Sequence, residues 1–253
     1  MTADNAALQK EASFHIKIFR AAAPYLIFNW KPFEIIWLIL FGTVAVALTV
    51  FYDSGFFAFT VYLAGIICVV LAAKGHILNY VIGLYNCFGY GYLSYANGLY
   101  GEMCLNFFFF VPMAIVGMMV WKRSLKKERV RMRALSPRHL AELVFLIALA
   151  VLAGGWCLSL IEGQNTPYLD SATNALSISA TFLMTWRYKE QWFAYIALDV
   201  LTIAMWFYRA LAGSPEGILM VSMWTAYLIN AAYGYRVWSV GAREDAEDME
   251  TSS

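Results

Sequence analysis

The segment from residue 170 to residue 206, DSATNALSISATFLMTWRYKEQWFAYIALDVLTIAMW, decides the fold. It predicts two apolar helices joined by a short charged turn at 187–190, each with a polar face at about 100° of rotation per residue. Lipid contact alone does not favour such faces, so we expect them to bind a small, ring-containing polar solute inside a membrane. The two faces consist of Ser171, Asn174, Ser177, Thr181 and Thr185, and of Trp192, Tyr195, Asp199, Thr202 and Trp206.

The composition places the chain among polytopic membrane proteins. Of its 253 residues, 61% are hydrophobic and 14% are charged, and the mean hydropathy is +0.60. A soluble domain of this size needs more charge to cover its surface. The four cysteines lie in apolar segments without a C-x-x-C pair, so we expect packing residues rather than disulfides or metal ligands. The polar N-terminus does not resemble a cleaved signal peptide.

Eight apolar segments approach the roughly 20 residues that a helix needs to cross a bilayer. Before them, residues 14–30 mix apolar side chains with Lys17 and Arg20, which predicts an interfacial helix or, equally, a docking arm. The eight segments span residues 33–51, 56–73, 78–96, 100–121, 140–161, 169–186, 191–209 and 216–238.

The positive charges lie in every second connection between the predicted spans. Of the 18 lysines and arginines, 17 fall on one side of the membrane, and eight of these lie between Lys122 and Arg138. Only Arg209 falls on the other side. Under the positive-inside rule both termini are expected in the cytoplasm, and a chain with seven spans would break the alternation.

Two groups of three spans resemble each other weakly. The alignment that places Asn86 against Asp199 also brings GMMVW at 117–121 against GYRVW at 234–238, after a short insertion. A unit of three spans ends on the opposite side of the membrane from the side where it began. One connecting helix returns the chain to the first side, so the second unit begins where the first one did. The two triplets are therefore expected to be parallel and related by a pseudo-two-fold axis along the membrane normal.

The predicted fold is an all-α polytopic membrane protein with two parallel three-helix repeats, a linker helix and one extra N-terminal helix. The basic loop is expected to set the topology, and a docking surface for a partner is the alternative reading. The predicted parts are an interfacial cytoplasmic segment (1–32), the extra helix (33–55), the first repeat (56–121), the basic cytoplasmic loop (122–139), the linker helix (140–166), the second repeat (167–240) and an acidic tail (241–253).

Asp199 is the most informative residue, because an ionised carboxylate in mid-span costs about 3 kcal/mol or more unless it faces water or a partner. We expect it to face a substrate, and the alternative is a hydrogen bond to a neighbouring helix. The same alternative stays open for Asn106, and an interfacial anchor is the alternative role of Trp192. The predicted substrate-binding residues are Asn86, Asn106, Phe110, Ser177, Thr181, Trp192, Tyr195, Asp199, Tyr227, Asn230 and Tyr233.

Signatures of enzymes are missing from the sequence. It contains no H-E-x-x-H, G-x-S-x-G, Walker loop or C-x-x-C motif. The three histidines, His15, His76 and His139, are too scattered to predict a metal site. The sequence therefore predicts a protein without catalytic activity, cofactor, bound metal or nucleic-acid partner, and without a means of using ATP.

The motif D-S followed by S-x-x-A-x-x-L-M-T-x-R-Y-x-E-x-W resembles the PnuC family of bacterial nicotinamide riboside transporters. N-Y-x-x-G-x-x-N at 79–86 and N-x-x-Y at 230–233 add to the resemblance, which covers about residues 56–240. The family pattern often has W-x-x-W where this chain has Trp192 and Tyr195. The residues of the main motif are Asp170, Ser171, Ser177, Ala180, Leu183, Met184, Thr185, Arg187, Tyr188, Glu190 and Trp192.

The resemblance implies a SWEET-like 3+1+3 fold and passage of nicotinamide riboside across the bacterial inner membrane without ion or ATP coupling. A cytoplasmic ribosylnicotinamide kinase would then trap the product. Aromatic faces attract a pyridinium ring, Asp199 can offset its charge, and Asn86 and Asn230 can bind the carboxamide or hydroxyls.

Two other functions stay open at this point. One is a sugar uniporter of the SWEET or PQ-loop groups, although the chain has no P-Q dipeptide. The other is a membrane receptor or scaffold that transports nothing. Membrane lipids are expected partners, and a homo-oligomer is compatible with the sequence.

Overall fold

The computed structural model describes residues 30–52, 55–96, 100–126, 129–160, 162, 166–211 and 217–251. Residues 44–253 form one compact unit, and residues 1–43 form another that is treated separately. The interfacial helix predicted at 14–30 lies outside the described residues except for its last one. Helix α2 (Pro32–Tyr52) corresponds to the predicted extra span, and the N–H of Lys31 donates to Glu34 Oε2 at its start, at 2.9 Å.

Every predicted span is helical in the structure, and the ends agree within three residues except at the C-terminal end of the last helix. The acidic segment predicted as a tail instead continues that helix to Glu250. The elements after α2 are α3 (Gly55–Ala73), α4 (Leu78–Ala96), α5 (Tyr100–Leu105), η1 (Asn106–Phe110), α6 (Val111–Lys122), β1 (Leu125–Lys126), β2 (Arg129–Val130), α7 (Pro137–Ser159), α8 (Pro167–Thr185), α9 (Gln191–Leu211) and α10 (Gly217–Glu250).

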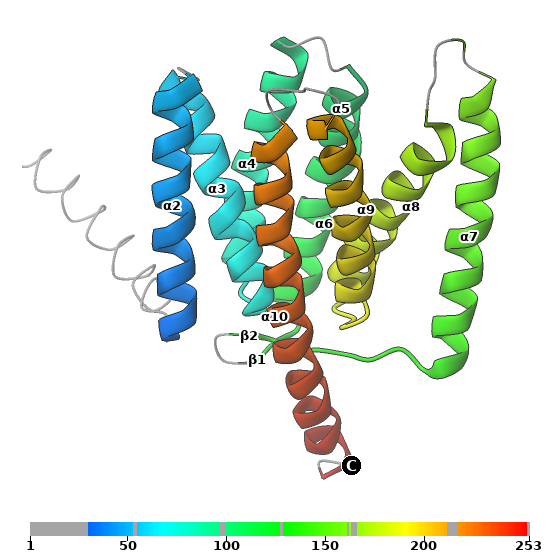
Figure 1. The fold of residues 1–253 in the computed structure, drawn as a ribbon. Coiled ribbons are helices and arrows are strands. Elements are labelled where there is room, and N and C mark those ends of the chain that lie inside the picture. The colour runs from blue at the N-terminus through cyan, green and yellow to red at the C-terminus, as the bar shows by residue number, and fades with distance from the viewer. Residues whose placement is uncertain are drawn as a thin grey trace, which may run out of the picture. The chain divides into compact units, whose positions relative to one another are not determined.

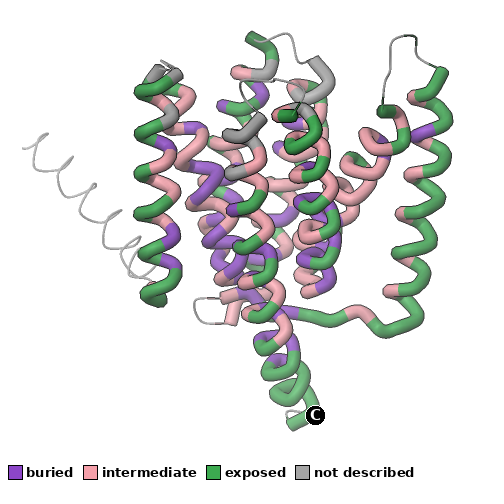
Figure 2. The backbone as a smooth tube through the Cα atoms, viewed as in Figure 1, coloured by how far each residue is buried: buried purple, intermediate pink, exposed green. Residues whose placement is uncertain are grey.

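Within the described part of the chain, α3, α4, α6, α8, α9 and α10 pack in a closed ring. Each contacts the next in this order, and α10 contacts α3. Helix α7 packs on α8, stands at the edge of this unit in Figure 1, and is mostly exposed in Figure 2. Its apolar surface therefore suits contact with lipid.

Five described helices are long and apolar enough to cross a membrane. Helices α4, α8 and α10 are not among them, although they carry many of the predicted site residues. Polar side chains lower their hydropathy, as expected for helices with faces that do not meet lipid. The five segments are Pro32–Phe51, Phe56–Ala73, Met103–Lys122, Pro137–Ser159 and Gln191–Tyr208.

The fourth span contains one π-helical turn, η1, where the N–H of Val111 donates to the carbonyl of Asn106. Pro112 accounts for this turn, because proline has no N–H and its ring clashes with the carbonyl four residues earlier in a regular helix. The wider turn relieves that clash. It places the predicted site residues Asn106 and Phe110 at its two ends.

The two G-x-x-x-W segments pack symmetrically at one end of the ring. Trp121 and Trp238 are fully buried, with ring centroids 5.7 Å apart. The indole of Trp121 on α6 donates to the carbonyl of Met184 on α8, at 2.9 Å. The indole of Trp238 on α10 donates to the carbonyl of Ala72 on α3, at 3.1 Å. Each tryptophan thus joins one half of the chain to the first helix of the other half.

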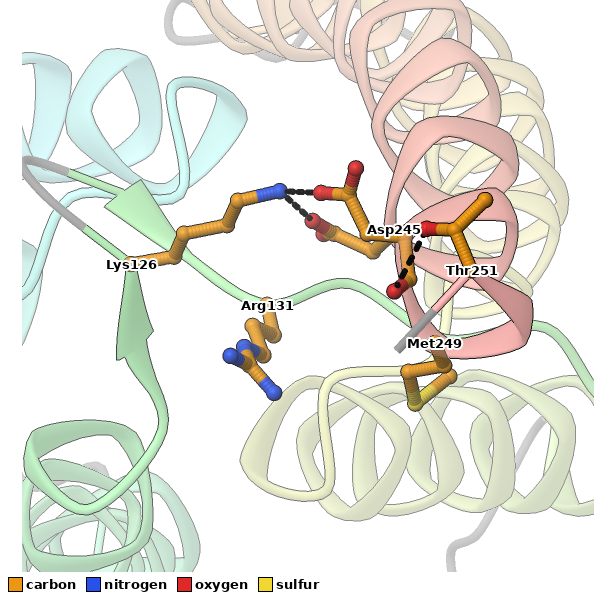
Figure 3. A pocket seen from close by; sticks show the side chains of 6 residues that line it. Lys126, Arg131, Asp245, Met249 and Thr251 are labelled. Carbon is orange, nitrogen blue, oxygen red and sulfur yellow. Dashed lines mark hydrogen bonds and ion pairs between the residues drawn. The ribbon is translucent and has the colours of Figure 1, made fainter. Parts of the chain in front are cut away.

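The basic loop predicted at 122–139 contains the β1–β2 hairpin and a segment that runs from it to α7 (Figure 1). Its first residue, Lys122, ends α6, and residues 137–139 begin α7. We call residues 123–126 and 129–136 the connector. Its main anchor is Asp245 on α10, which accepts from the N–H of Met132 at 2.8 Å and from Arg129 Nη1 at 2.7 Å. Lys126 pairs with Asp245, as Figure 3 shows. It also pairs with Asp248.

Asp245 stays ionised despite its burial. Burial alone would raise the pKa of this carboxyl, but the N–H of Met132, Arg129 and Lys126 together hold the pKa below its ordinary value. A cavity of about 270 Å³ adjoins these groups and is lined by Lys126, Arg131, Asp245, Asp248, Met249 and Thr251 (Figure 3). This cavity lies at the connector and does not include Asp199.

Candidate functional site

The predicted polar face of α9 is turned inward. Trp192 and Asp199 are each 3% exposed and Thr202 is also buried, whereas Phe193 and Phe207 on the other face are about half exposed. The hydroxyl of Thr202 donates to the carbonyl of Leu198 one turn earlier. The amphipathic pattern of α9 therefore predicted its buried face correctly.

Two tyrosine hydroxyls lie near Asp199, and a thiol lies near both of them. The electrostatic neighbours of the Tyr195 hydroxyl include Thr181, Cys68 and Asp199. Those of the Tyr227 hydroxyl again include Cys68 and Asp199. We call Cys68, Thr181, Tyr195, Asp199 and Tyr227 the interior cluster. It draws side chains from α3, α8, α9 and α10 and brings together four of the predicted site residues.

Asn86 joins this arrangement through Gly65 on α3. A Cβ atom at Gly65 would lie 3.0 Å from Asn86 Nδ2 and 3.5 Å from the Tyr227 hydroxyl, so the two side chains converge on this glycine. Asn86 Nδ2 also donates to the carbonyl of Val61, at 2.8 Å. One donor of Asn86 therefore fixes α4 to α3 while the side chain stands next to Tyr227.

The polar face of α8 serves two different contacts. Thr181 faces Tyr195, and its hydroxyl donates to the carbonyl of Ser177 at 2.8 Å. Ser171 instead donates to the carbonyl of Ala150 on α7, at 3.3 Å. Ser171 therefore faces α7 and Thr181 faces α9, because a stripe about 120° wide spans both sides of the helix.

Trp192 lies at the start of α9 and is held by aromatic neighbours. Its ring centroid is 5.8 Å from that of Tyr195 and 6.3 Å from that of Trp238. A Cβ atom at Gly234 would lie 2.5 Å from the ring, so α10 approaches Trp192 closely because residue 234 has no side chain. Its burial does not fit the alternative role of an interfacial anchor.

The other predicted residues have structural contacts of their own. Asn230 is buried and its Nδ2 donates to the carbonyl of Val69 on α3, at 3.1 Å, which is the interhelical role. Asn106 is buried in the π turn, and the ring of Phe110 contacts that of Phe109. Tyr233 packs against the core around Trp192 and Trp238.

Sequence reasoning missed the two inward-facing thiols, Cys68 and Cys87, and interpreted them as packing residues. Cys87 is a further neighbour of Tyr195. A usable signal was present, because the alignment that pairs Asn86 with Asp199 also pairs Cys68 with Thr181. Among the described residues, no group of three histidine, cysteine or acidic side chains could hold a metal ion.

Comparison with known proteins relates this chain to a protein family. The model of the family described as nicotinamide mononucleotide transporter matches residues 55–240. The nicotinamide riboside transporter PnuC of Neisseria mucosa is 33% identical over 219 residues, which cover 83% of this chain and 82% of that protein. The PnuC of Haemophilus influenzae is 33% identical over 215 residues, covering 83% and 91%.

A solved structure supports the same assignment. The crystal structure of the vitamin B3 transporter PnuC has a TM-score of 0.74 and 32% sequence identity, and covers 88% of this chain and 97% of that one. The residues that the family model matches, 55–240, include the interior cluster, five of the ring helices and α10 up to residue 240. The chain therefore belongs to the nicotinamide mononucleotide transporter family, which is a family of membrane transporters.

Proposed function

We propose that this protein takes up nicotinamide riboside across a bacterial inner membrane as a uniporter, by facilitated diffusion and without enzymatic activity. The single observation that carries this proposal is the burial of Asp199 among tyrosine hydroxyls inside a ring of helices. Relatives named as nicotinamide riboside transporters, at 33% identity over most of the chain, support the choice of solute.

The chemistry of the interior cluster suits a cationic nucleoside. Nicotinamide riboside carries a positive pyridinium ring, which a carboxylate and aromatic faces both attract. The mononucleotide also carries a phosphate, which Asp199 would repel. No lysine or arginine belongs to the interior cluster, so a nucleoside fits this site better than a nucleotide.

The arrangement of the ring supports a SWEET-like 3+1+3 architecture. If α3, α4 and α6 form one triplet and α8, α9 and α10 the other, each contact within one triplet has a counterpart in the other. The crossed bonds of Trp121 and Trp238 follow the same pseudo-symmetry. Rocking of the two triplets would then expose the interior cluster to either side in turn.

The positive charges orient this architecture. With the connector, the 187–190 turn and both termini in the cytoplasm, the chain obeys the positive-inside rule. Uptake by diffusion only equilibrates the solute, so net accumulation depends on a cytoplasmic ribosylnicotinamide kinase that removes it.

Uptake into liposomes tests the function. The purified protein should equilibrate labelled nicotinamide riboside across the membrane in the absence of ATP and of ion gradients. Unlabelled nicotinamide riboside should compete, whereas sugars should not. Competition by sugars would favour a SWEET or PQ-loop type of uniporter, and a lack of any equilibration would favour a receptor or scaffold.

A further inference from the structure

Two side chains next to the interior cluster have polar atoms without hydrogen-bond partners. Tyr80 is 5% exposed and Trp192 is 3% exposed. Within the described part of the chain, neither the Tyr80 hydroxyl nor Trp192 Nε1 meets a partner, and Thr185 lies near Tyr80 without hydrogen-bond geometry. Buried polar groups of this kind are rare, because each loses its hydrogen bonds to water and gains none from the protein.

The unpartnered atoms are concentrated at the starts of α4 and α9. Asn79, the residue before Tyr80, has a buried Oδ1 without a hydrogen-bond partner in the described part of the chain. The same holds for both amide atoms, Oε1 and Nε2, of Gln191, the residue before Trp192. Tyr80 and Trp192 both adjoin Tyr195: Tyr195 is an electrostatic neighbour of the Tyr80 hydroxyl, and its ring contacts Trp192. Both donors therefore lie beside the interior cluster.

The two rings are fixed by matching contacts from the two halves of the chain. The ring of Tyr80 lies on Gly117, where a Cβ atom would come within 2.4 Å, and contacts Trp121 at 4.9 Å. Trp192 lies on Gly234 and contacts Trp238 in the same way. Rings held so closely present their donors without rearrangement, which lowers the entropic cost of binding a solute.

We propose that Tyr80 is a substrate-binding residue and acts with Trp192 as a donor pair for the carboxamide oxygen of nicotinamide riboside. A carbonyl oxygen has two lone pairs and can accept one hydrogen bond from each donor. This inference rests on the proposed function. It assigns different parts of the solute to different residues of the site. Asp199 offsets the charge of the ring, and the donor pair recognises the group attached to it.

The variant Tyr80→Phe removes one unpartnered hydroxyl and leaves the ring in place. Without solute, it should melt at the same temperature as the wild type or higher, because no hydrogen bond is lost and a buried polar atom is removed. In titration calorimetry its affinity for nicotinamide riboside should fall about tenfold or more. Its affinity for pyridinium riboside, which keeps the charge and ribose but lacks the carboxamide, should not change.

Tyr85→Phe is the matched control on the same helix. The Tyr85 hydroxyl lies 2.7 Å from that of Thr60, so this change removes a hydrogen bond that the protein makes itself. It should lower the melting temperature slightly and leave both affinities unchanged. Trp192→Phe removes the second donor. It should likewise lower the affinity for nicotinamide riboside more than the affinity for pyridinium riboside.

Two results would overturn the proposal. One is an unchanged affinity of Tyr80→Phe for nicotinamide riboside. The other is a melting temperature of solute-free Tyr80→Phe below that of Tyr85→Phe, which would show that the hydroxyl has a structural partner. If the wild type bound no nicotinamide riboside, the proposed function would fail instead, and the melting comparison would still decide whether the Tyr80 hydroxyl is unpartnered.

Discussion

At the scale of single residues, close approach between helices depends on glycines that face aromatic rings. Gly234 contacts the ring of Trp192, and Gly117 contacts the ring of Tyr80. An added Cβ atom at either glycine would lie too close to the ring to fit without a shift. Each glycine lets a ring approach a helix backbone closely. The positions of Trp192 and Tyr80 beside the interior cluster are therefore set partly by the absence of side chains elsewhere.

Gly234→Ala should displace the Trp192 ring, because the new Cβ atom would lie 2.5 Å from it. Overpacking of this kind typically costs about 1–3 kcal/mol. We expect a lower melting temperature and weaker binding of nicotinamide riboside in the same variant. Gly42→Ala is the control, since nothing lies within 4 Å of its added Cβ atom. Equal melting and binding for both variants would show that the ring does not depend on Gly234.

At the scale of elements, the connector is tied to α10 rather than free as a loop. The carboxylate of Asp245 accepts from the N–H of Met132, from Arg129 and from Lys126. The N–H of Arg133 also donates to the carbonyl of Arg187 in the α8–α9 turn, at 2.8 Å. The N–H of Lys189 in the same turn donates to the carbonyl of Arg133. The connector thereby joins the ends of several ring helices.

Asp245→Asn should loosen the connector, because removing one partner of a buried charge pair leaves the other partners unpaired. Hydrogen exchange at the amide of Met132 and its neighbours should become faster, while the ring helices stay protected. Asp248→Asn is the control, since Asp248 is exposed and pairs with Lys126. Equal exchange in both variants would contradict this role of Asp245.

The same contact predicts a pH dependence. Because the folded pKa of Asp245 lies below its ordinary value, its contribution is complete above about pH 4 and is lost as the pH falls further. Protection of the connector, corrected for intrinsic exchange rates, should therefore stay constant between pH 5 and pH 8. A marked change within that range would mean that a different group anchors the connector.

The elements also show what the sequence could and could not predict. Apolar segments of about 20 residues predicted the positions of the long helices, because a bilayer imposes that length. The inward face of α9 followed from helical periodicity and one acid, Asp199. The hairpin and the extension of α10 to Glu250 were not predictable, because they depend on contacts between Asp245 and residues more than a hundred positions earlier. The double use of α8 likewise depended on where α7 packs.

At the scale of the whole molecule, the proposed pseudo-symmetry predicts equal roles for Trp121 and Trp238. Trp121→Phe and Trp238→Phe each remove the indole donor of one interhelical hydrogen bond, at a cost of about 1–3 kcal/mol. We expect similar decreases in melting temperature, and a double variant that loses less than their sum because the rings touch. Trp186→Phe, at an exposed position stacked on Phe182, should have little effect. A large difference between the two variants would argue against the pseudo-symmetry.

The account depends on one buried carboxyl group whose ionised form attracts a cationic solute, and calorimetry on Asp199→Asn tests it most directly. This change keeps the shape and removes the charge, and Asp170→Asn at the far end of α8 is the control. The wild type should bind nicotinamide riboside more tightly than its uncharged dihydropyridine form. Asp199→Asn should lose about tenfold or more of the affinity for the cation, equivalent to about 1.4 kcal/mol, and little for the neutral form. Unchanged affinity for the cation, or an equal loss for both solutes, would contradict the account.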